Sequence, residues 1–240
     1  NETDWSSAES ATADESIIFH DAFEETVVSG RTSTMDPDWT GSDTRTGLWN
    51  EDSGTILTPY GDQVMYVWNS RYVTTKASSL SDVLTAGTDY TLTFNAAAEN
   101  GNGGINYQAE LLAGSTIVAT VNDGPMTTKN MADYSDSLTF RPDSSHPNLG
   151  NTLALRLRYA SGDWHYVMGY DNVVLRAVPD ETPPSPNPLG FLVEPFGINA
   201  TSIVMTASNA TDATGPVEYL MTNDTAGVSS GWSTNTFWMN

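Results

Sequence analysis

The chain of 240 residues carries 30 Asp and Glu against 9 Lys and Arg, a formal net charge of −21, and it has no cysteine. This acidic excess argues against a nucleic-acid partner, because phosphate binding requires clustered Lys and Arg side chains. No run approaches the roughly 18 continuous apolar residues of a membrane-spanning helix. Without cysteine, thiol catalysis, Cys-ligated zinc and disulfide bonds are excluded, so any bound metal must be held by oxygen.

The first residues and the charge bear on where the protein acts. The chain begins Asn-Glu-Thr-Asp, with neither an initiator Met nor the charged and then apolar pattern of a signal peptide, which favours a processed or excised soluble chain. A strong negative charge suits extracellular or saline surroundings, where salt screens the self-repulsion. We therefore expect a secreted or cell-surface protein.

In chain order, an acidic leader comes first and a series of strands follows it. Residues 1–15 show no periodicity and predict an acidic leader or linker. From residue 17, short apolar runs rich in Val, Thr, Tyr and Trp alternate with Gly, Asp, Asn and Pro clusters, which predicts short antiparallel strands. No segment has the pattern of a long amphipathic helix. The strands predicted here are residues 16–19, 64–68, 90–97, 107–112, 115–121, 134–140, 152–159 and 171–178.

Several of these strands alternate between apolar and polar residues. Leu153, Leu155 and Leu157 fall on one face of a predicted strand, and Arg156 and Arg158 fall on the other. One face is therefore expected to be buried. About eight such strands predict an all-β fold, a two-sheet antiparallel jelly-roll β-sandwich spanning residues 16–178. An immunoglobulin-like sandwich is the alternative, although its Cys-Trp-Cys signature is absent.

A second module is predicted after a proline-rich segment. Residues 179–188 hold five of the 12 prolines, and this density predicts a stiff, extended linker. Residues 189–240 contain further predicted strands, but about 50 residues fall short of the roughly 100 of an immunoglobulin-class sandwich. This module is therefore expected to be incomplete. Its predicted strands are residues 201–206, 217–222 and 236–239.

Two segments at the ends of the first module carry a family resemblance. Residues 20–25 (HDAFEE) resemble the opening segment of jelly-roll carbohydrate-binding modules, and residues 169–175 (GYDNVVL) resemble their closing strand. Within this superfamily, internal segments are more similar to the branch that contains the calcium-dependent Stig cyclases. Those segments are residues 39–41 (WTG), 48–50 (LWN), 84–92 (LTAGTDYTL) and 108–114 (QAELLAG). The resemblance covers roughly residues 17–177 and implies a jelly-roll fold.

The linker and tail resemble a different family. Residues 182–188, 208–219 and 230–233 are similar to fibronectin-type-III-like repeats of secreted, multimodular bacterial proteins that act on polysaccharide. The resemblance implies a partial immunoglobulin or fibronectin-type-III-like β module at residues 189–240, within a longer parent protein.

The resemblance of the first module also implies a structural calcium ion. In the modules that it resembles, the opening Glu and the closing Asp hold calcium, and the matching positions are Glu24 and Asp171. Two carboxylates and backbone carbonyls can supply the six to eight oxygens that calcium takes. The family usually has Asn where this chain has His20. The alternative is that both acids are exposed turn residues of an acidic protein.

Aromatic residues with polar neighbours predict a sugar site. Sugars offer apolar faces to flat rings and hydroxyl groups to polar side chains. Core packing is the competing interpretation, since Trp and Tyr are ordinary strand residues. The predicted carbohydrate-binding residues are Trp49, Trp68, Tyr72, Tyr107, Trp164, His165 and Tyr166.

Signs of catalysis are few in this sequence. His20, His146 and His165 lack the spacing of a zinc helix, and no G-x-S-x-G elbow occurs. The resemblance offers an enzymatic alternative, because Stig cyclases act by acid-assisted rearrangement with an acidic side chain close to the closing strand. No carboxylate stands just before Asp171, which argues against that activity.

The sequence therefore predicts a non-catalytic carbohydrate-binding module that belongs to a polysaccharide-degrading parent enzyme. We expect a monomeric unit that binds a polysaccharide, with a neutral glycan favoured because an anionic one would be repelled by the net charge of −21. The alternatives are a calcium-dependent cyclase of the Stig type and a structural or adhesive spacer domain.

Overall fold

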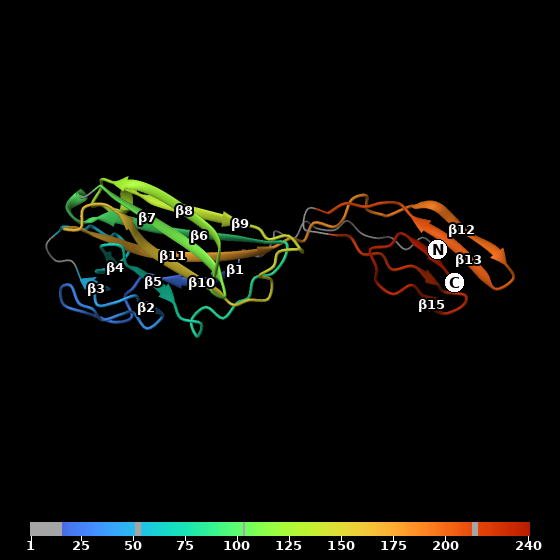
Figure 1. Ribbon diagram of the computed structural model, residues 1–240, viewed down its shortest axis with the longest axis horizontal. Coiled ribbons are helices and arrows are strands. Elements are labelled where there is room, and N and C mark those ends of the chain that lie inside the picture. The colour runs from blue at the N-terminus through green and yellow to red at the C-terminus, as the bar shows by residue number, and fades with distance from the viewer. Residues whose placement is uncertain (1–15, 51–53, 103, 213–215) are drawn as a thin grey trace.

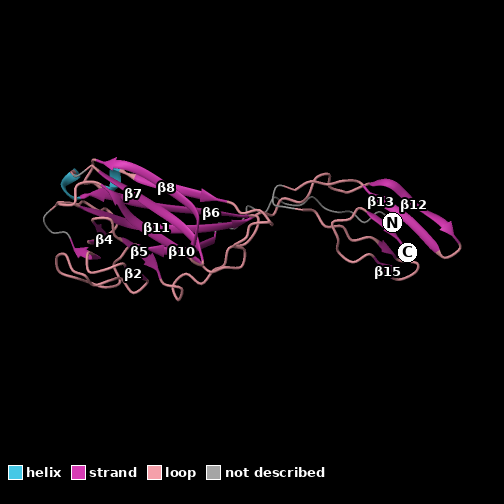
Figure 2. Cartoon of the chain, in the orientation of Figure 1, coloured by secondary structure: helices cyan, strands magenta, loops and turns pink. Residues whose placement is uncertain are grey.

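A larger β-sandwich and a smaller group of strands form the molecule, joined by an extended segment (Figure 1). The computed structural model describes residues 16–50, 54–102, 104–212 and 216–240. The predicted leader at residues 1–15 lies outside them. The two helices in the described part are single 3-10 turns, Glu99–Gly101 and Met131–Asp133 (Figure 2). No described helix is long and apolar enough to cross a membrane.

Two antiparallel sheets face each other in the larger body. The first sheet has the order β3-β4-β11-β6-β9, and β1 pairs with β11 beyond the end of β4. Its strands are β1 (Ser16–Asp21), β3 (Thr46–Asn50), β4 (Gln63–Trp68), β6 (Thr88–Ala98), β9 (Ser135–Phe140) and β11 (Val167–Pro179). The second sheet has the order β2-β5-β10-β7-β8. Its strands are β2 (Trp39–Gly41), β5 (Tyr72–Thr75), β7 (Ile105–Ala113), β8 (Thr116–Met126) and β10 (Leu153–Ser161).

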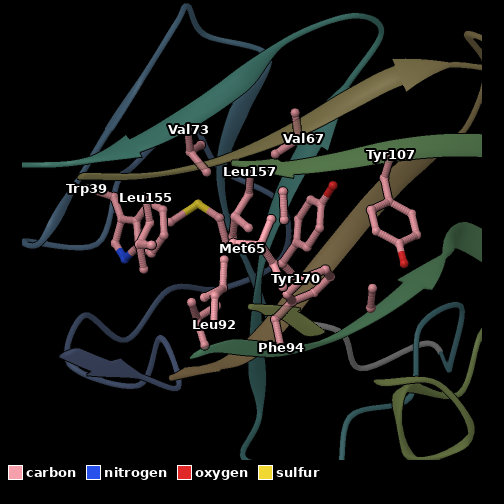
Figure 3. Packing of buried hydrophobic residues seen from close by; sticks show 14 of the residues in the cluster. Trp39, Met65, Val67, Val73, Leu92, Phe94, Tyr107, Leu155, Leu157 and Tyr170 are labelled. Carbon is pink, nitrogen blue, oxygen red and sulfur yellow. The ribbon is translucent and has the colours of Figure 1, made fainter. Parts of the chain in front are cut away.

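The hydrophobic core lies between the two sheets, as the alternating pattern predicted (Figure 3). On β10, Leu155 and Leu157 are fully buried, whereas Arg156 and Arg158 lie half-buried on the outer face. Burial of each leucine side chain contributes about 1.5–3 kcal/mol relative to exposure. The all-β sandwich predicted from the sequence is confirmed.

A second apolar layer covers part of the outer face of the first sheet. Ile56 and Met131 pack against β4 and β11, next to Gly169. A Cβ atom at Gly169 would lie 2.9 Å from Ile56 Cδ1 and 2.9 Å from Met131 Cε, so a larger residue here would require the ends of these two side chains to move. The cluster consists of Trp49, Ile56, Val64, Tyr66, Ala97, Met131 and Val167, with Trp68 at its margin. Apolar side chains therefore cover this part of the outer face of the first sheet.

The C-terminal strands form two small sheets, the larger of which has three strands. It has the order β12-β13-β16, with bounds Phe191–Asn199, Ser202–Ala207 and Phe237–Met239. A separate pair joins β14 (Thr222–Asn223) to β15 (Val228–Ser229). All nine residues of β12 are exposed, in contrast to the buried strands of the sandwich. The assignment of this region to a separate domain stays a prediction.

The sequence located the long strands and missed the short ones. All eight strands predicted in residues 16–178 have a counterpart, often one to five residues longer. The strands missed there are β2, β3 and β5, and each of them, at three to five residues, is too short to show a clear alternation. In the tail, β12 was missed and residues 217–222 form only a bridge at Tyr219 and the start of β14.

Candidate active site and candidate metal centre

A chain of tyrosine and aspartate side chains runs from the core to the surface near the edge where β8 and β9 lie. The Tyr107 side chain is fully buried, and its hydroxyl donates to Asp136 Oδ2 at 2.6 Å. The same hydroxyl lies 2.6 Å from that of Tyr134, which in turn donates to Asp123 Oδ2. Asp123 is exposed, and Tyr134 and Asp136 are half-buried. We call these four residues the Tyr–Asp array.

Aromatic rings surround the inner end of the Tyr–Asp array. The Tyr107 ring lies edge-on to Phe94 at a centroid distance of 5.7 Å, to Tyr134 at 6.0 Å and to Tyr170 at 6.3 Å. Figure 3 shows Phe94, Tyr107 and Tyr170 close to one another in the core. Aromatic faces attract cations, and buried sites strengthen that attraction. The inner end of the array therefore combines hydrogen-bonding phenols with rings that could stabilise positive charge.

Burial and hydrogen bonds determine how the array holds its protons. Burial raises the pKa of Tyr107 above its ordinary range and that of Tyr134 to about 12, so both phenols stay protonated near neutral pH. The hydrogen bond from Tyr134 lowers the pKa of Asp123, which favours its ionised form. The array makes three oxygen–oxygen contacts with only two phenolic protons, so it has room for a third proton.

A small cavity adjoins the outer end of the array. Its volume is about 130 Å³, and its lining includes Asp123, Pro125, Met126 and Tyr134. Ligand pockets are usually about 300–1,000 Å³. The cavity therefore has room for water but not for a drug-sized ligand without movement of its walls.

Three aspartates form a second polar site at the edge of the sandwich. Asp21 ends β1, and its carboxylate accepts from the Phe23 amide at 2.6 Å and from the Trp39 indole N–H at 2.7 Å. Asp36 is fully buried, and its Oδ1 accepts from the Asp38 amide at 3.2 Å. One carboxylate oxygen from each aspartate lies within 4.8 Å of the others. This group could hold a metal ion, and we call it the Asp cluster.

Burial has a large effect on the Asp cluster. Removal from water, with repulsion from Asp36 among the further causes, raises the pKa of Asp21 to about 7. Removal from water also raises the pKa of Asp36. The negative charges therefore require a compensating proton or cation. Carboxylate oxygens are the ligands that hard cations prefer, so the donor set fits the calcium that the resemblance implied.

The predicted calcium ligands Glu24 and Asp171 lie elsewhere. Asp171 is buried and accepts from the Thr58 hydroxyl and from the Asn172 amide at 2.7 Å. Glu24 is exposed, and its Oε1 accepts two amides of the loop before β4 at 2.8 and 2.9 Å. Burial, with the charge of Glu24 as a smaller cause, raises the pKa of Asp171 to about 7. The two carboxylates therefore interact, but their role as calcium ligands stays a prediction.

The seven predicted sugar-binding residues do not share one groove. Tyr107 lies in the core, and Trp49 is buried beneath the Arg31 guanidinium at 4.1 Å. Tyr72 lies on the second sheet, where the Arg156 guanidinium is 5.2 Å from its ring centroid. Trp68 belongs to the margin of the outer apolar layer, on the first sheet. These four residues are therefore spread over both sheets and the core.

The remaining three lie in the turn between β10 and β11. Trp164 is 56% exposed, and its ring stacks on His165 at 3.8 Å. His165 Nδ1 lies 2.6 Å from Asp163 Oδ1, and Tyr166 packs against the core. His165 is exposed as well, and the Trp164 carbonyl accepts a hydrogen bond from the Trp68 indole N–H, so this turn brings Trp68, Trp164 and His165 together.

A family model described as HpiC1-like, HpiC1 cyclase, matches residues 15–176, which is more than half of the chain. The chain belongs to this cyclase family. Among curated proteins, none matches it. The matched residues cover the sandwich up to residue 176 in β11, including the Tyr–Asp array and the Asp cluster.

Solved structures show a related fold. A cyclase from Fischerella sp. TAU has 26% identity, covers 67% of this chain and 95% of its own, and has a TM-score of 0.54. The Stig cyclase Fisc from Fischerella sp. TAU, in complex with (3Z)-3-(1-methyl-2-pyrrolidinylidene)-3H-indole, has 24% identity, coverages of 68% and 99% and a TM-score of 0.52. A xylan-binding domain from Paenibacillus barcinonensis has 11% identity, coverages of 69% and 97% and a TM-score of 0.48.

The family match overturns the functional prediction made from the sequence. The predicted non-catalytic carbohydrate-binding module, the absence of enzymatic activity and the polysaccharide partner are wrong, because the matching family is one of cyclases. The segments that suggested carbohydrate binding belong to the region of β1 and to β11, which hold the sandwich together. Such segments report a fold, and one fold can serve several functions.

Sequence reasoning missed the residues of both polar sites except Tyr107, which it assigned to sugar. The Asp cluster had a weak signal, the segment MDPDW, in which two aspartates precede a tryptophan. Asp123, Tyr134 and Asp136 had none, because turn and strand acids are common in a chain with 30 of them. Their proximity depends on the pairing of β7 with β8 and of β6 with β9.

Proposed function

We propose that the sandwich is a catalytic domain that promotes acid-assisted cyclisation of an apolar aromatic small molecule of the indole class. The Tyr–Asp array set among aromatic rings is the observation that carries the proposal. Membership of the HpiC1-like cyclase family supports the reaction type. The indole class follows from the compound named with the Fischerella Stig cyclase structure.

The array would act as the proton source. A phenol with a raised pKa is a poor acid alone, but it can give up its proton while it accepts another from a hydrogen-bonded neighbour. With a third proton, each of the three oxygen–oxygen contacts in the array would be a hydrogen bond. Tyr107, at the inner end of the array, would donate a proton to the substrate. An alkene of the substrate would take this proton, the resulting cation would close the ring, and loss of a proton would restore the array.

The rings beside Tyr107 would stabilise the cation formed during ring closure. Phe94 and Tyr170 pack around Tyr107, and their centroids are 5.9 Å apart. Cation–π contacts are worth about 2 kcal/mol or more when water is excluded. Because the adjoining cavity is about 130 Å³, a prenylated indole would require displacement of side chains around Tyr134. We expect substrate binding to change the environment of this residue.

The remaining features of the protein are proposed as follows. An ion bound at the Asp cluster would be calcium with a structural role. It would neutralise the buried carboxylates and take no part in proton transfer. The antiparallel strands β12, β13 and β16 support a partial fibronectin-type-III-like module at residues 189–240. The net charge of −21 supports a secreted or cell-surface location.

The proposed activity is tested by turnover of a prenylated indole in buffer with calcium. Cyclisation gives a product of unchanged mass and altered chromatographic retention, which liquid chromatography with mass spectrometry detects. Tyr107→Phe should reduce the rate by about 100-fold or more. Tyr159→Phe is the matched control, since it removes another buried tyrosine hydroxyl, which donates to the Asp163 carbonyl at 2.8 Å. No turnover by the native protein, or equal losses in both variants, would contradict the proposal.

A further inference from the structure

A fully buried carboxylate oxygen in the Asp cluster has no hydrogen-bond donor. Asp36 is 0% exposed, and its Oδ2 accepts from no N–H or hydroxyl group of the described residues. Buried polar atoms are almost always hydrogen-bonded, and an unpaired buried charge is especially unfavourable. An oxygen in this state requires either a proton shared with a neighbouring carboxylate or a bound cation.

The neighbours of this oxygen do not supply positive charge. Among the described residues, none of Asp21, Asp36 and Asp38 forms an ion pair with Lys, Arg or His. The donors nearby, the amides of Phe23 and Asp38, serve other oxygens of the cluster. Three carboxylates within a few ångströms repel one another strongly at low dielectric constant. The missing partner is therefore expected to be a cation.

We propose that Asp21, Asp36 and Asp38 bind a divalent cation of the calcium type. Three oxygens within 4.8 Å of one another match the span across a calcium coordination sphere, in which each Ca–O distance is about 2.4 Å. Magnesium would draw its ligands to within about 4.2 Å and demand octahedral geometry. Water molecules would complete the coordination on the side of Asp38, which is half-buried.

This site would tie the two sheets together at one edge. Asp21 ends β1, which pairs with β11 of the first sheet, whereas Asp36 and Asp38 directly precede β2 of the second sheet. The segment 22–38 connects these strands. A cation held at both ends of this segment would restrain it and would stabilise the folded state by mass action. The inference does not require the cyclase activity, and it places the cation apart from Glu24 and Asp171.

The full chain, stripped of metal with chelator, provides the test. Calcium should raise its melting temperature, and terbium should bind at one equivalent with luminescence sensitised by Trp39, whose indole N–H bonds to Asp21. Asp38→Asn should lower the affinity for calcium and for terbium at least tenfold. Asp36→Asn should do the same if the variant folds. Trp39→Phe should retain the calcium effect on melting but lose most of the terbium signal.

Glu24→Gln is the matched control, because it removes a carboxylate from the alternative calcium pair. The variant should bind calcium and terbium like the native chain. The inference is overturned if the native chain shows no calcium-dependent change in melting. It is also overturned if Asp38→Asn binds like the native chain, or if Glu24→Gln abolishes binding. Turnover plays no part in these measurements, so their failure is distinct from failure of the proposed cyclisation.

Discussion

The Tyr–Asp array and the Asp cluster are two polar sites in one sandwich, and their groups are satisfied in opposite ways. In the array, each carboxylate accepts a hydrogen bond from a tyrosine. In the cluster, carboxylates face one another, and Asp36 Oδ2 has no donor. A hydrogen-bonded array can store and move protons, whereas an acidic cluster lacking donors favours an external cation. The difference separates a site suited to proton transfer from one suited to metal binding.

The pH dependence of stability should show the largest effect of the cluster. The folded-state pKa of Asp21, about 7, lies above its ordinary 3.8, so between these values the folded protein binds more protons than the unfolded chain. In chelator, this residue's contribution should therefore be lost as pH rises from about 4 to 7, by no more than about 4 kcal/mol. Urea unfolding of the native chain and Asp21→Asn at several pH values measures it. If the free energy of unfolding varies with pH in the same way in both proteins, Asp21 is not the cause of the pH dependence.

Removal of the buried charge of Asp36 should have opposite effects on stability without and with calcium. Asp36→Asn replaces an unpaired carboxylate by a neutral amide of similar shape, so it should stabilise the metal-free protein by about 2 kcal/mol near pH 7.5. In calcium the same variant should be less stable than the native chain, because it loses a ligand. Denaturation midpoints of both proteins, measured with and without calcium, show whether the effect of Asp36→Asn on stability changes sign. If it does not, the cluster does not differ from the array in its need for a cation.

Tyr107→Phe should destabilise the protein, since both carboxylates of the Tyr–Asp array already accept hydrogen bonds from tyrosine. Loss of a buried hydroxyl bonded to Asp136 and Tyr134 should destabilise the protein by about 1.5 kcal/mol. Calcium should leave this loss unchanged, because the array includes no residue of the cluster. Chemical denaturation gives the value, with Tyr159→Phe as the matched variant. A loss that disappears in calcium would show that the two sites are coupled.

Tyr134→Phe should have the smallest effect on stability. Its hydroxyl is half-buried and joins Tyr107 to the exposed Asp123, so water can replace part of the lost hydrogen bonding. We expect a cost of about 0.5–1 kcal/mol. Because this residue would connect the array to solvent, the rate of proposed turnover should fall more than stability does. A thermal melt and the turnover assay, run on the same preparation, check both parts.

The long strands could be predicted because their residues carry local signals. The alternation of Leu153, Leu155 and Leu157 with arginines indicates a strand with one buried face, and the structure confirms it. The sites could not be found this way. Asp21 and Asp36 are 15 positions apart in a long connection, and Asp123 and Asp136 belong to different sheets. No local pattern distinguishes these acids from the other acidic residues of the chain.

The sequence by itself determined the all-β architecture, the lack of thiol chemistry and the requirement for oxygen ligands, because these depend on residue type and short-range periodicity. The tertiary structure decided which aromatic residues are buried and which acids meet. Tyr107 shows the reason: from its neighbours in sequence it could serve as an exposed platform, but strand pairing turns it into the core beside Phe94 and Tyr170. Burial and proximity arise from the packing of distant segments, and these two properties give a side chain its chemistry.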